Sequence, residues 1–255
     1  MRPAYDDPFI NGKSYKPRML VLEVRDPDQL EDDPVGRVLV ERTEVATFHE
    51  GAIYESTIEM HYRLIAGGDT RDAGNRQDRG SFVAHYSSLD QLTSLTSSSI
   101  GNGGAIFLDL PGLKGHRVGS YLFNEIVLWA QRQGNPDAGV RTIHLLEGQA
   151  GASNKERRNR LYETFGIQFD YADADHIAGT SRPMVVAQLV PLSSIPANLK
   201  ELHLFDYLGD LVTREETARR EVSFLKDANN ELHAQRRAAA AKPLRWTLKH
   251  WLGFF

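Results

Sequence analysis

Four short segments of the first third of the chain are rich in apolar and β-branched residues, which is typical of strands. Valine and isoleucine are frequent in these segments, and glycine, proline and aspartate separate them. Residues 66–80, just before the last segment, are rich in glycine and charge and predict a hairpin loop. The predicted strands are Met19–Arg25, Arg37–Glu44, Ser56–Ile65 and Ser81–Ser87.

Strand and helix patterns alternate in the second half of the chain. A short apolar run before Pro111 predicts a buried strand, and apolar residues at helical spacing predict a long helix that ends at Gly134. Together with the first four strands, this order predicts an α/β fold in which helices flank a mixed central sheet. The predicted strands are Gly104–Leu110, Val140–Leu146 and Met184–Val190, and the predicted helices are Leu89–Leu95, Val118–Gln133 and Lys155–Phe165.

The chain turns helical after Pro191. A capping box at Thr213 and Glu216 predicts a helix that runs to Ala241. A coiled-coil dimer, a helix folded onto its own domain and a helix bound to a partner protein all remain open. Heptad spacing relates Leu204, Leu211, Ala218, Leu225, Leu232 and Ala239, and Leu208, Val222 and Asn229 fill the complementary seam, which Glu215 and Arg236 interrupt.

These patterns divide the chain into three parts. Residues 1–18 are expected to form an extended arm, residues 19–192 an α/β domain, and residues 193–255 a helical C-terminal extension. The last twelve residues, 244–255, are basic and aromatic, and they suit either docking on a protein or contact with a membrane surface. We therefore expect a homodimer or a protein partner to use residues 197–255.

Composition excludes several classes of protein. The chain has 255 residues, no cysteine and a net charge of −4. Without cysteine it has no disulfide, thiolate nucleophile or cysteine metal site. The charge makes nucleic acid an unlikely partner without excluding it, and no apolar run reaches the roughly 18 residues of a membrane span. The absence of an apolar signal core at the start predicts a cytoplasmic protein.

The turn between the strand ending at Leu110 and the following helix is a candidate anion site. The first N–H groups of a helix lack internal partners and lie at the positive end of the helix dipole. Gly115 and Gly119 allow a phosphate to approach the main chain, and Lys114 and Arg117 add positive charge. The turn lacks both the P-loop pattern and the dinucleotide-binding pattern. We therefore expect neither an ATP enzyme nor a nicotinamide enzyme.

Two sequence blocks closely resemble the GNAT superfamily of acyl-CoA-dependent N-acetyltransferases. The first is the loop 114–119 followed by Ser120-Tyr121-Leu122, and the second is Asn154 with the phrase Leu161–Ile167. The resemblance covers roughly residues 100–190. It implies that acetyl-CoA is the co-substrate and that an amine is the acceptor. The cofactor-binding residues that it implies are Leu108, Leu110, Lys114, Gly115, His116, Arg117, Val118, Gly119, Ser120 and Asn154.

The resemblance also implies a mechanism of direct attack by the amine on the thioester. Tyr162 aligns with the tyrosine that protonates the departing thiolate in many members of the family. The candidate bases that accept the amine's proton are Glu147 and Asp109, and then Glu59 or His61. The basic residues 155–160 suit a 3′-phosphate, an acidic substrate or a solvated helix face. No grouping has the spacing of a metal site.

A second reading assigns the chain to a different class. In this second reading the domain is a catalytically silent scaffold that acts through its C-terminal helices. Arg117 is then a sign that the phosphate loop has lost its function, because the family has glycine at this position. Acetyl-CoA binding together with loss of activity in Tyr162→Phe would separate the two readings. An acyltransferase with a longer acyl donor is a third possibility.

Overall fold

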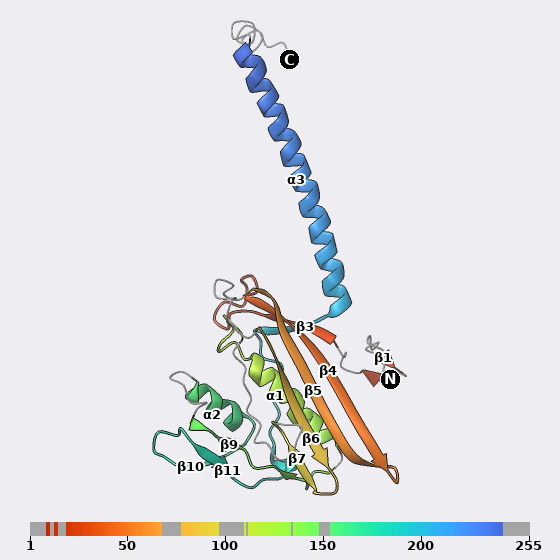
Figure 1. Cartoon of the computed structure of the whole chain (residues 1–255), viewed down its shortest axis with the longest axis vertical. Helices are drawn as coiled ribbons and strands as arrows, with labels where there is room; N and C mark the ends of the chain where they lie inside the picture. Colours follow the sequence, from red (N-terminus) through yellow and green to blue (C-terminus); the bar gives the residue numbers. More distant parts are fainter. Residues whose placement is uncertain are drawn as a thin grey trace. The chain divides into compact units, whose positions relative to one another are not determined.

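The computed structural model describes residues 19–67, 78–96, 110, 112–133, 135–147 and 154–241, together with the main chain of 9–10 and 13–14. The chain divides into two compact units, Met1–Leu204 and Phe205–Phe255. The first unit is a mixed α/β fold, and the second is built on one long helix (Figure 1). Several predicted features lie outside the described residues: most of the arm 1–18, the loop 68–77, the strand 104–109 and the aromatic end 244–255.

A seven-stranded mixed sheet forms the centre of the first unit. Neighbouring strands are antiparallel, except for one parallel pair at the edge, β7 with β8. A separate antiparallel pair joins β1 (Phe9–Ile10) to β2 (Lys13–Ser14). The strand order is β12 (Leu199–His203), β3 (Met19–Val24), β4 (Gly36–His49), β5 (Ala52–Gly67), β6 (Arg79–Ser87), β7 (Leu92–Ser94) and β8 (Gly139–Val140).

The four predicted strands of the first third are confirmed as β3 to β6. Alternate residues of β4, β5 and β6 are buried on one face, where Val40, Tyr62 and Phe82 belong to the core. The short helix predicted at Leu89–Leu95 is wrong. Leu92–Ser94 instead pairs with β6 and β8, so tertiary pairing overrides a weak local pattern.

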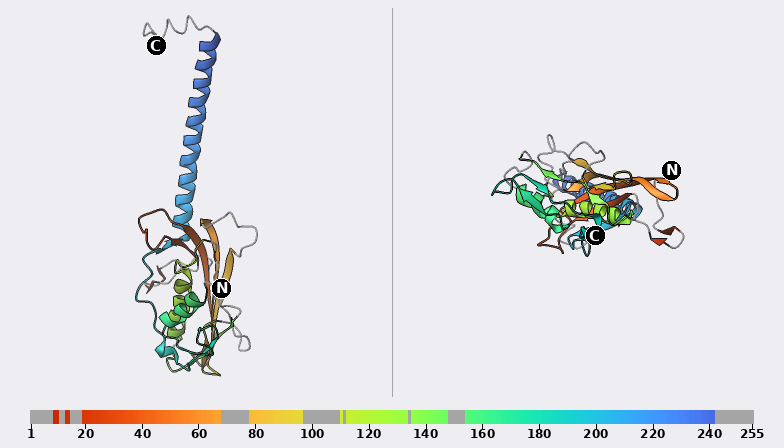
Figure 2. Two further views of the ribbon diagram at one scale, coloured as in Figure 1. Left: turned by 90° about the vertical axis from the view of Figure 1, so that its left-hand side faces the viewer. Right: turned by 90° about the horizontal axis from the view of Figure 1, so that it is seen from below.

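Helix α1 (Val118–Arg132) lies across the buried face of the sheet and packs on β5 and β6 (Figures 1 and 2). It confirms the predicted helix at Val118–Gln133. Ten of its fifteen residues are buried, because the helix is covered on two sides. Phe123 makes edge contacts with Tyr162 and Phe165, whose ring centroids lie 5.6 and 4.9 Å away. The core therefore continues from the sheet through α1 to the next helix.

Helix α2 (Lys155–Thr164) confirms the second predicted helix and ends beside Gly166, whose φ of +81° favours glycine. A small antiparallel sheet of order β10–β11–β9 accompanies it. The strand predicted at Met184–Val190 is wrong, because a 3₁₀ turn (Val186–Gln188) occupies it and its N–H groups bond to scattered loop carbonyls. The strands of this small sheet are β9 (His144–Leu145), β10 (Phe169–Tyr171) and β11 (Gly179–Ser181). Of the predicted strand Val140–Leu146, only Val140, the last residue of β8, and the two residues of β9 are in strands.

The second unit begins at the start of helix α3 (Leu204–Ala241). Two expectations differ from the structure here. Residues from 193 onwards do not turn helical at once, because Leu199–His203 pairs with β3 as β12. Thr213 does not open a helix either; it lies inside α3, where its hydroxyl donates a hydrogen bond of 2.9 Å to Gly209 O. Of the helices that the structure describes, none is both long and apolar enough to cross a membrane.

Candidate anion-binding pocket

A pocket of about 570 Å³ opens between the start of α1 and the side of α2. The loop before α1 and the first turn of α1 form one wall, α2 forms another, and Leu192 and Pro196 border the remainder. Residues that the sequence placed in two separate blocks therefore meet at one cavity. The predicted site residues that line it are Lys114, Gly115, Arg117, Val118, Gly119, Ser120, Asn154 and Tyr162.

The main chain of the loop presents N–H groups to this pocket. The first helical hydrogen bond of α1 runs from Tyr121 N–H to Arg117 O, so the N–H groups of residues 118–120 precede the helical ladder. No acidic residue occupies the first turn, and Arg117 provides no side-chain cap. The positive end of the helix dipole therefore faces the cavity without a carboxylate of its own turn to neutralise it.

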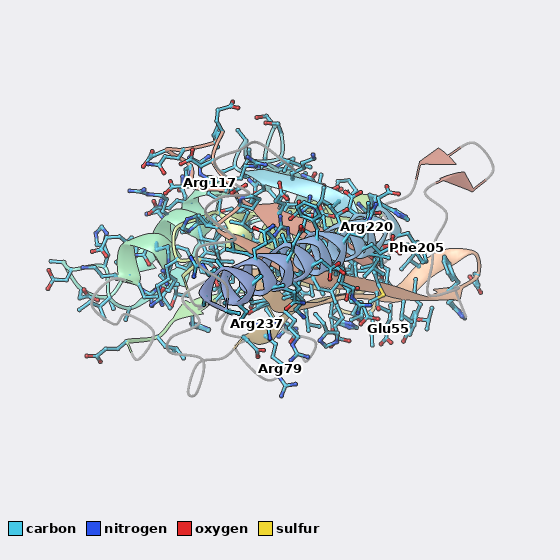
Figure 3. All side chains as sticks on the ribbon, turned by 90° about the horizontal axis from the view of Figure 1, so that it is seen from above. Glu55, Arg79, Arg117, Phe205, Arg220 and Arg237 are labelled. Atoms are coloured by element: carbon cyan, nitrogen blue, oxygen red, sulfur yellow. The ribbon has the colours of Figure 1, made fainter. Side chains whose placement is uncertain are left out.

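Arg117 adopts a left-handed backbone conformation. Its φ is +63° and its ψ is 11°, and Gly115 two residues earlier has a φ of +83°. Arg117 is one of the side chains labelled in Figure 3. This conformation costs a residue other than glycine about 1–2 kcal/mol relative to the right-handed α conformation. Glycine would adopt this conformation without strain, whereas the backbone of Arg117 is strained.

Positive charge dominates the lining of the pocket. Glu156 is the one acid among the lining residues, and five of them are basic. This excess is notable in a chain whose net charge is −4. Like charges around one concavity raise its positive potential and attract a multivalent anion. The basic lining residues are Lys114, Arg117, Arg157, Arg158 and Arg160.

Arg158 differs from the other basic residues because its guanidinium is committed to the fold. It is buried, and it donates hydrogen bonds to Leu146 O (3.0 Å), Ile177 O (2.7 Å) and Asn159 Oδ1 (3.1 Å). Desolvation lowers the pKa of this guanidinium below its usual value. Arg158 therefore ties α2 to the end of β9 and to the turn before β11.

Tyr162 lies one helical turn after Arg158 and is buried except where it lines the pocket. Its ring packs on Phe123 and, at 5.5 Å between centroids, on Phe169. Burial raises the pKa of the Tyr162 hydroxyl to about 12, against the smaller opposing effect of Arg158. The phenol is therefore protonated at neutral pH and available as a hydrogen-bond donor.

The remaining predicted residues lie elsewhere. Leu110 is buried in the core and His116 is half-buried; neither lines the pocket. Glu147 is exposed outside the lining, whereas Asp109 and Leu108 fall outside the described residues. Asn154 accepts a hydrogen bond of 2.6 Å from Arg157 Nη2 at the rim. Glu59 and His61 pair with each other at 3.1 Å on β5.

Sequence reasoning missed the buried polar groups that hold the start of α1. Tyr121 Oη donates a hydrogen bond of 2.6 Å to Glu201 Oε1 of β12, and burial raises the pKa of Tyr121 above its usual value. One turn later Glu125 is buried, with its carboxylate 3.8 Å from Arg42 Nε. A glutamate within an apolar helical run was the signal in the sequence. These contacts fix the first turns of α1 against β12 and β4.

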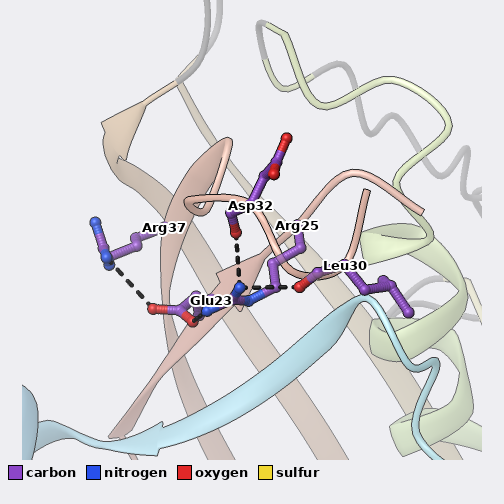
Figure 4. Close-up of polar contacts among 5 residues, drawn as sticks. All are labelled: Glu23, Arg25, Leu30, Asp32 and Arg37. Carbon is purple, nitrogen blue, oxygen red and sulfur yellow. Dashed lines mark hydrogen bonds and ion pairs between the residues drawn. The ribbon is translucent and has the colours of Figure 1, made fainter. Parts of the chain in front are cut away.

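A second polar cluster orders the connection between β3 and β4 (Figure 4). Glu23 is buried and pairs with Arg25 at 3.1 Å and with Arg37 at 3.3 Å. Arg25 also donates to the main-chain oxygens of Leu30 and Asp32, at 2.9 and 2.7 Å. This cluster supports the sheet and does not line the pocket.

Comparisons with known proteins add little to this picture. No protein-family model matches the chain, and no curated protein matches it. Among solved structures, a crystallised domain from Methanocaldococcus jannaschii DSM 2661 is similar at 13% identity and a TM-score of 0.29. The match covers 51% of this chain and 66% of that domain, just under two thirds of its length.

Proposed function

We propose that the protein is an acyl-CoA-dependent N-acetyltransferase that binds acetyl-CoA in the pocket between α1 and α2. The observation that carries the proposal is the meeting of the loop 114–120 and Tyr162 at one cavity with basic walls. The resemblance to the GNAT superfamily rests on these same two blocks. Acetyl-CoA carries a pyrophosphate and a 3′-phosphate, which suit a site of helix N–H groups and guanidinium groups.

In the proposed reaction, the acceptor's amine nitrogen attacks the thioester carbonyl carbon. A C–N bond forms and the C–S bond breaks, so the amine loses one proton and the thiolate of coenzyme A gains one. The amide and the free thiol are the products. A substrate positioned by several phosphate contacts reacts as part of one bound complex, which lowers the entropic cost of bringing the reactants together.

Tyr162 is proposed to stabilise the departing thiolate. An ordinary thiol has a pKa of about 8.5, whereas that of Tyr162 is about 12. The phenol is therefore the weaker acid, and full proton transfer from it to the thiolate is uphill. Its larger contribution is a hydrogen bond donated to the sulfur as negative charge develops there.

Calorimetric titration with acetyl-CoA tests the cofactor site. We expect the native chain to bind and Gly119→Trp to lose binding, because an indole at residue 119 fills the pocket beside the N–H groups. Gly209→Trp is the matched control, since an added Cβ at Gly209 has nothing within 4 Å. If the native chain binds neither acetyl-CoA nor longer acyl-CoAs, the enzyme proposal fails and the scaffold reading takes its place.

A further inference from the structure

Helix α3 carries an apolar seam whose side chains are exposed. The helix has 38 residues and none of them is buried. Leucines and a valine along one stripe are 43–64% exposed: Leu208, Leu211, Val222, Leu225 and Leu232. Most of the stability of a helix in a protein comes from packing of its apolar face. We therefore expect a partner to cover this seam.

The seam has the heptad register of a two-stranded coiled coil. Writing Leu211, Leu225 and Leu232 as d positions places Val222 and Asn229 at a positions. A β-branched residue at a with leucine at d favours two parallel strands. We propose that α3 pairs with α3 of a second copy of this chain as a parallel, in-register coiled coil.

Asn229 points to self-pairing in this orientation. In a parallel pair, each a residue meets the same residue of the other copy, so the two Asn229 amides can hydrogen-bond to each other. An antiparallel pair would place this amide against an apolar d residue and leave it without that partner. The polar layer therefore fixes both the orientation and the register of the pair, and a second copy supplies the matching amide.

One pair of opposite charges beside the seam supports a symmetric parallel pair. Glu221 occupies a g position and Lys226 the following e position, so each copy's Glu221 faces the other's Lys226. Glu215, the acidic a position, pairs with Arg219 of its own helix at 2.6 Å. In this register Arg214 at g faces Arg219 at e of the other copy, and the two Glu215 side chains lie between these arginines and offset their repulsion.

Single-cysteine variants test the proposal, because the native chain contains no cysteine. Val222→Cys places a thiol at an a position and leaves Asn229 in place, and Ser223→Cys places one at the adjacent b position. We expect Val222→Cys to form an intermolecular disulfide about tenfold faster under mild oxidation, because a disulfide needs Cα atoms within about 7 Å. Equal rates, or no cross-linking of either variant, would overturn the parallel in-register pair.

The mass of the full chain in solution gives a second test. Sedimentation equilibrium should show twice the 28.6 kDa of one chain. Leu225→Lys should shift the protein to the single-chain mass, whereas Phe224→Lys should not, although Phe224 is 72% exposed and lies outside the seam. A native chain that sediments as a monomer, or a dimer that both variants leave intact, would refute the pairing.

Discussion

Replacing Arg158 by methionine tests whether this side chain holds α2 in place. Methionine keeps an apolar stem of similar length but removes the guanidinium that donates to Leu146 O, Ile177 O and Asn159 Oδ1. Because two of the acceptors are main-chain carbonyls outside α2, the change detaches the helix from two neighbouring segments. Arg160→Met on the same helix is the control, since Arg160 is exposed.

The expected loss follows from the two carbonyl bonds. A hydrogen bond to a charged group contributes about 1.5–3 kcal/mol, and a carbonyl left dry costs about as much. Leu146 is exposed, so water can replace the hydrogen bond that its carbonyl loses. Ile177 is half-buried, so water replaces the hydrogen bond to its carbonyl less completely. Arg158→Met should therefore lower the free energy of unfolding by about 2–4 kcal/mol, and Arg160→Met by no more than about 0.5 kcal/mol.

Urea unfolding followed by near-ultraviolet circular dichroism measures both variants, with the buried Trp129 as a reporter of the core. Arg158→Lys adds a graded point, because an ammonium lacks the fixed fork that reaches two carbonyls at once. It should fall between the native chain and Arg158→Met. The reasoning is wrong if Arg158→Met costs less than about 1 kcal/mol or no more than Arg160→Met.

Two variants test the pocket further. Tyr162→Phe should lower kcat by about 10²–10³ with acetyl-CoA affinity unchanged, and steady-state assays of thiol release that show no loss would exclude the role of the hydroxyl. Burial raises the pKa of Tyr162 to about 12, so the contribution of the protonated phenol to stability is complete below about pH 10 and is lost as the pH rises towards 12. The melting temperature of Tyr162→Phe should therefore fall less between about pH 10 and 12 than that of the native chain. Arg117→Gly should stabilise the unliganded protein by about 0.5–1 kcal/mol, because relief of strain exceeds the entropy cost of glycine. The same variant should bind acetyl-CoA more weakly with a smaller salt dependence, and a thermal shift or titration of opposite sign would contradict this.

Local patterns predicted the elements whose burial is periodic. The strands β4 to β6 alternate over part of their length, and β3 is a short apolar run that is buried almost throughout. Helix α1 repeats its apolar residues at helical spacing, and α2 ends beside Gly166. These signals are carried by neighbouring residues, so they are visible without the fold. The pairing of the loop 114–120 with Tyr162 also emerged from the sequence, through the resemblance to a family and not through any local pattern.

Elements that depend on distant partners were not predictable in the same way. Leu199–His203 is short and has no clear alternation, and it becomes a strand because β3 offers an open edge about 180 residues earlier in the chain. The basic residues of α2 look alike in sequence, yet Arg158 is buried and Arg160 is exposed. Only the position of β9 and of the turn at Ile177 separates their roles.

Arg117 brings strain and charge together in one residue, and the balance between them bears on whether the pocket is active. The left-handed backbone of Arg117 costs the free protein about 1–2 kcal/mol. Among the described residues, none forms an ion pair or hydrogen bond with the Arg117 side chain that would offset this cost. A charge-assisted bond to a phosphate contributes about 1.5–3 kcal/mol. The arginine is therefore unfavourable in the empty pocket and favourable in an occupied one. Under the proposed function this combination is expected, because a bond to a bound phosphate offsets the strain of the left-handed arginine.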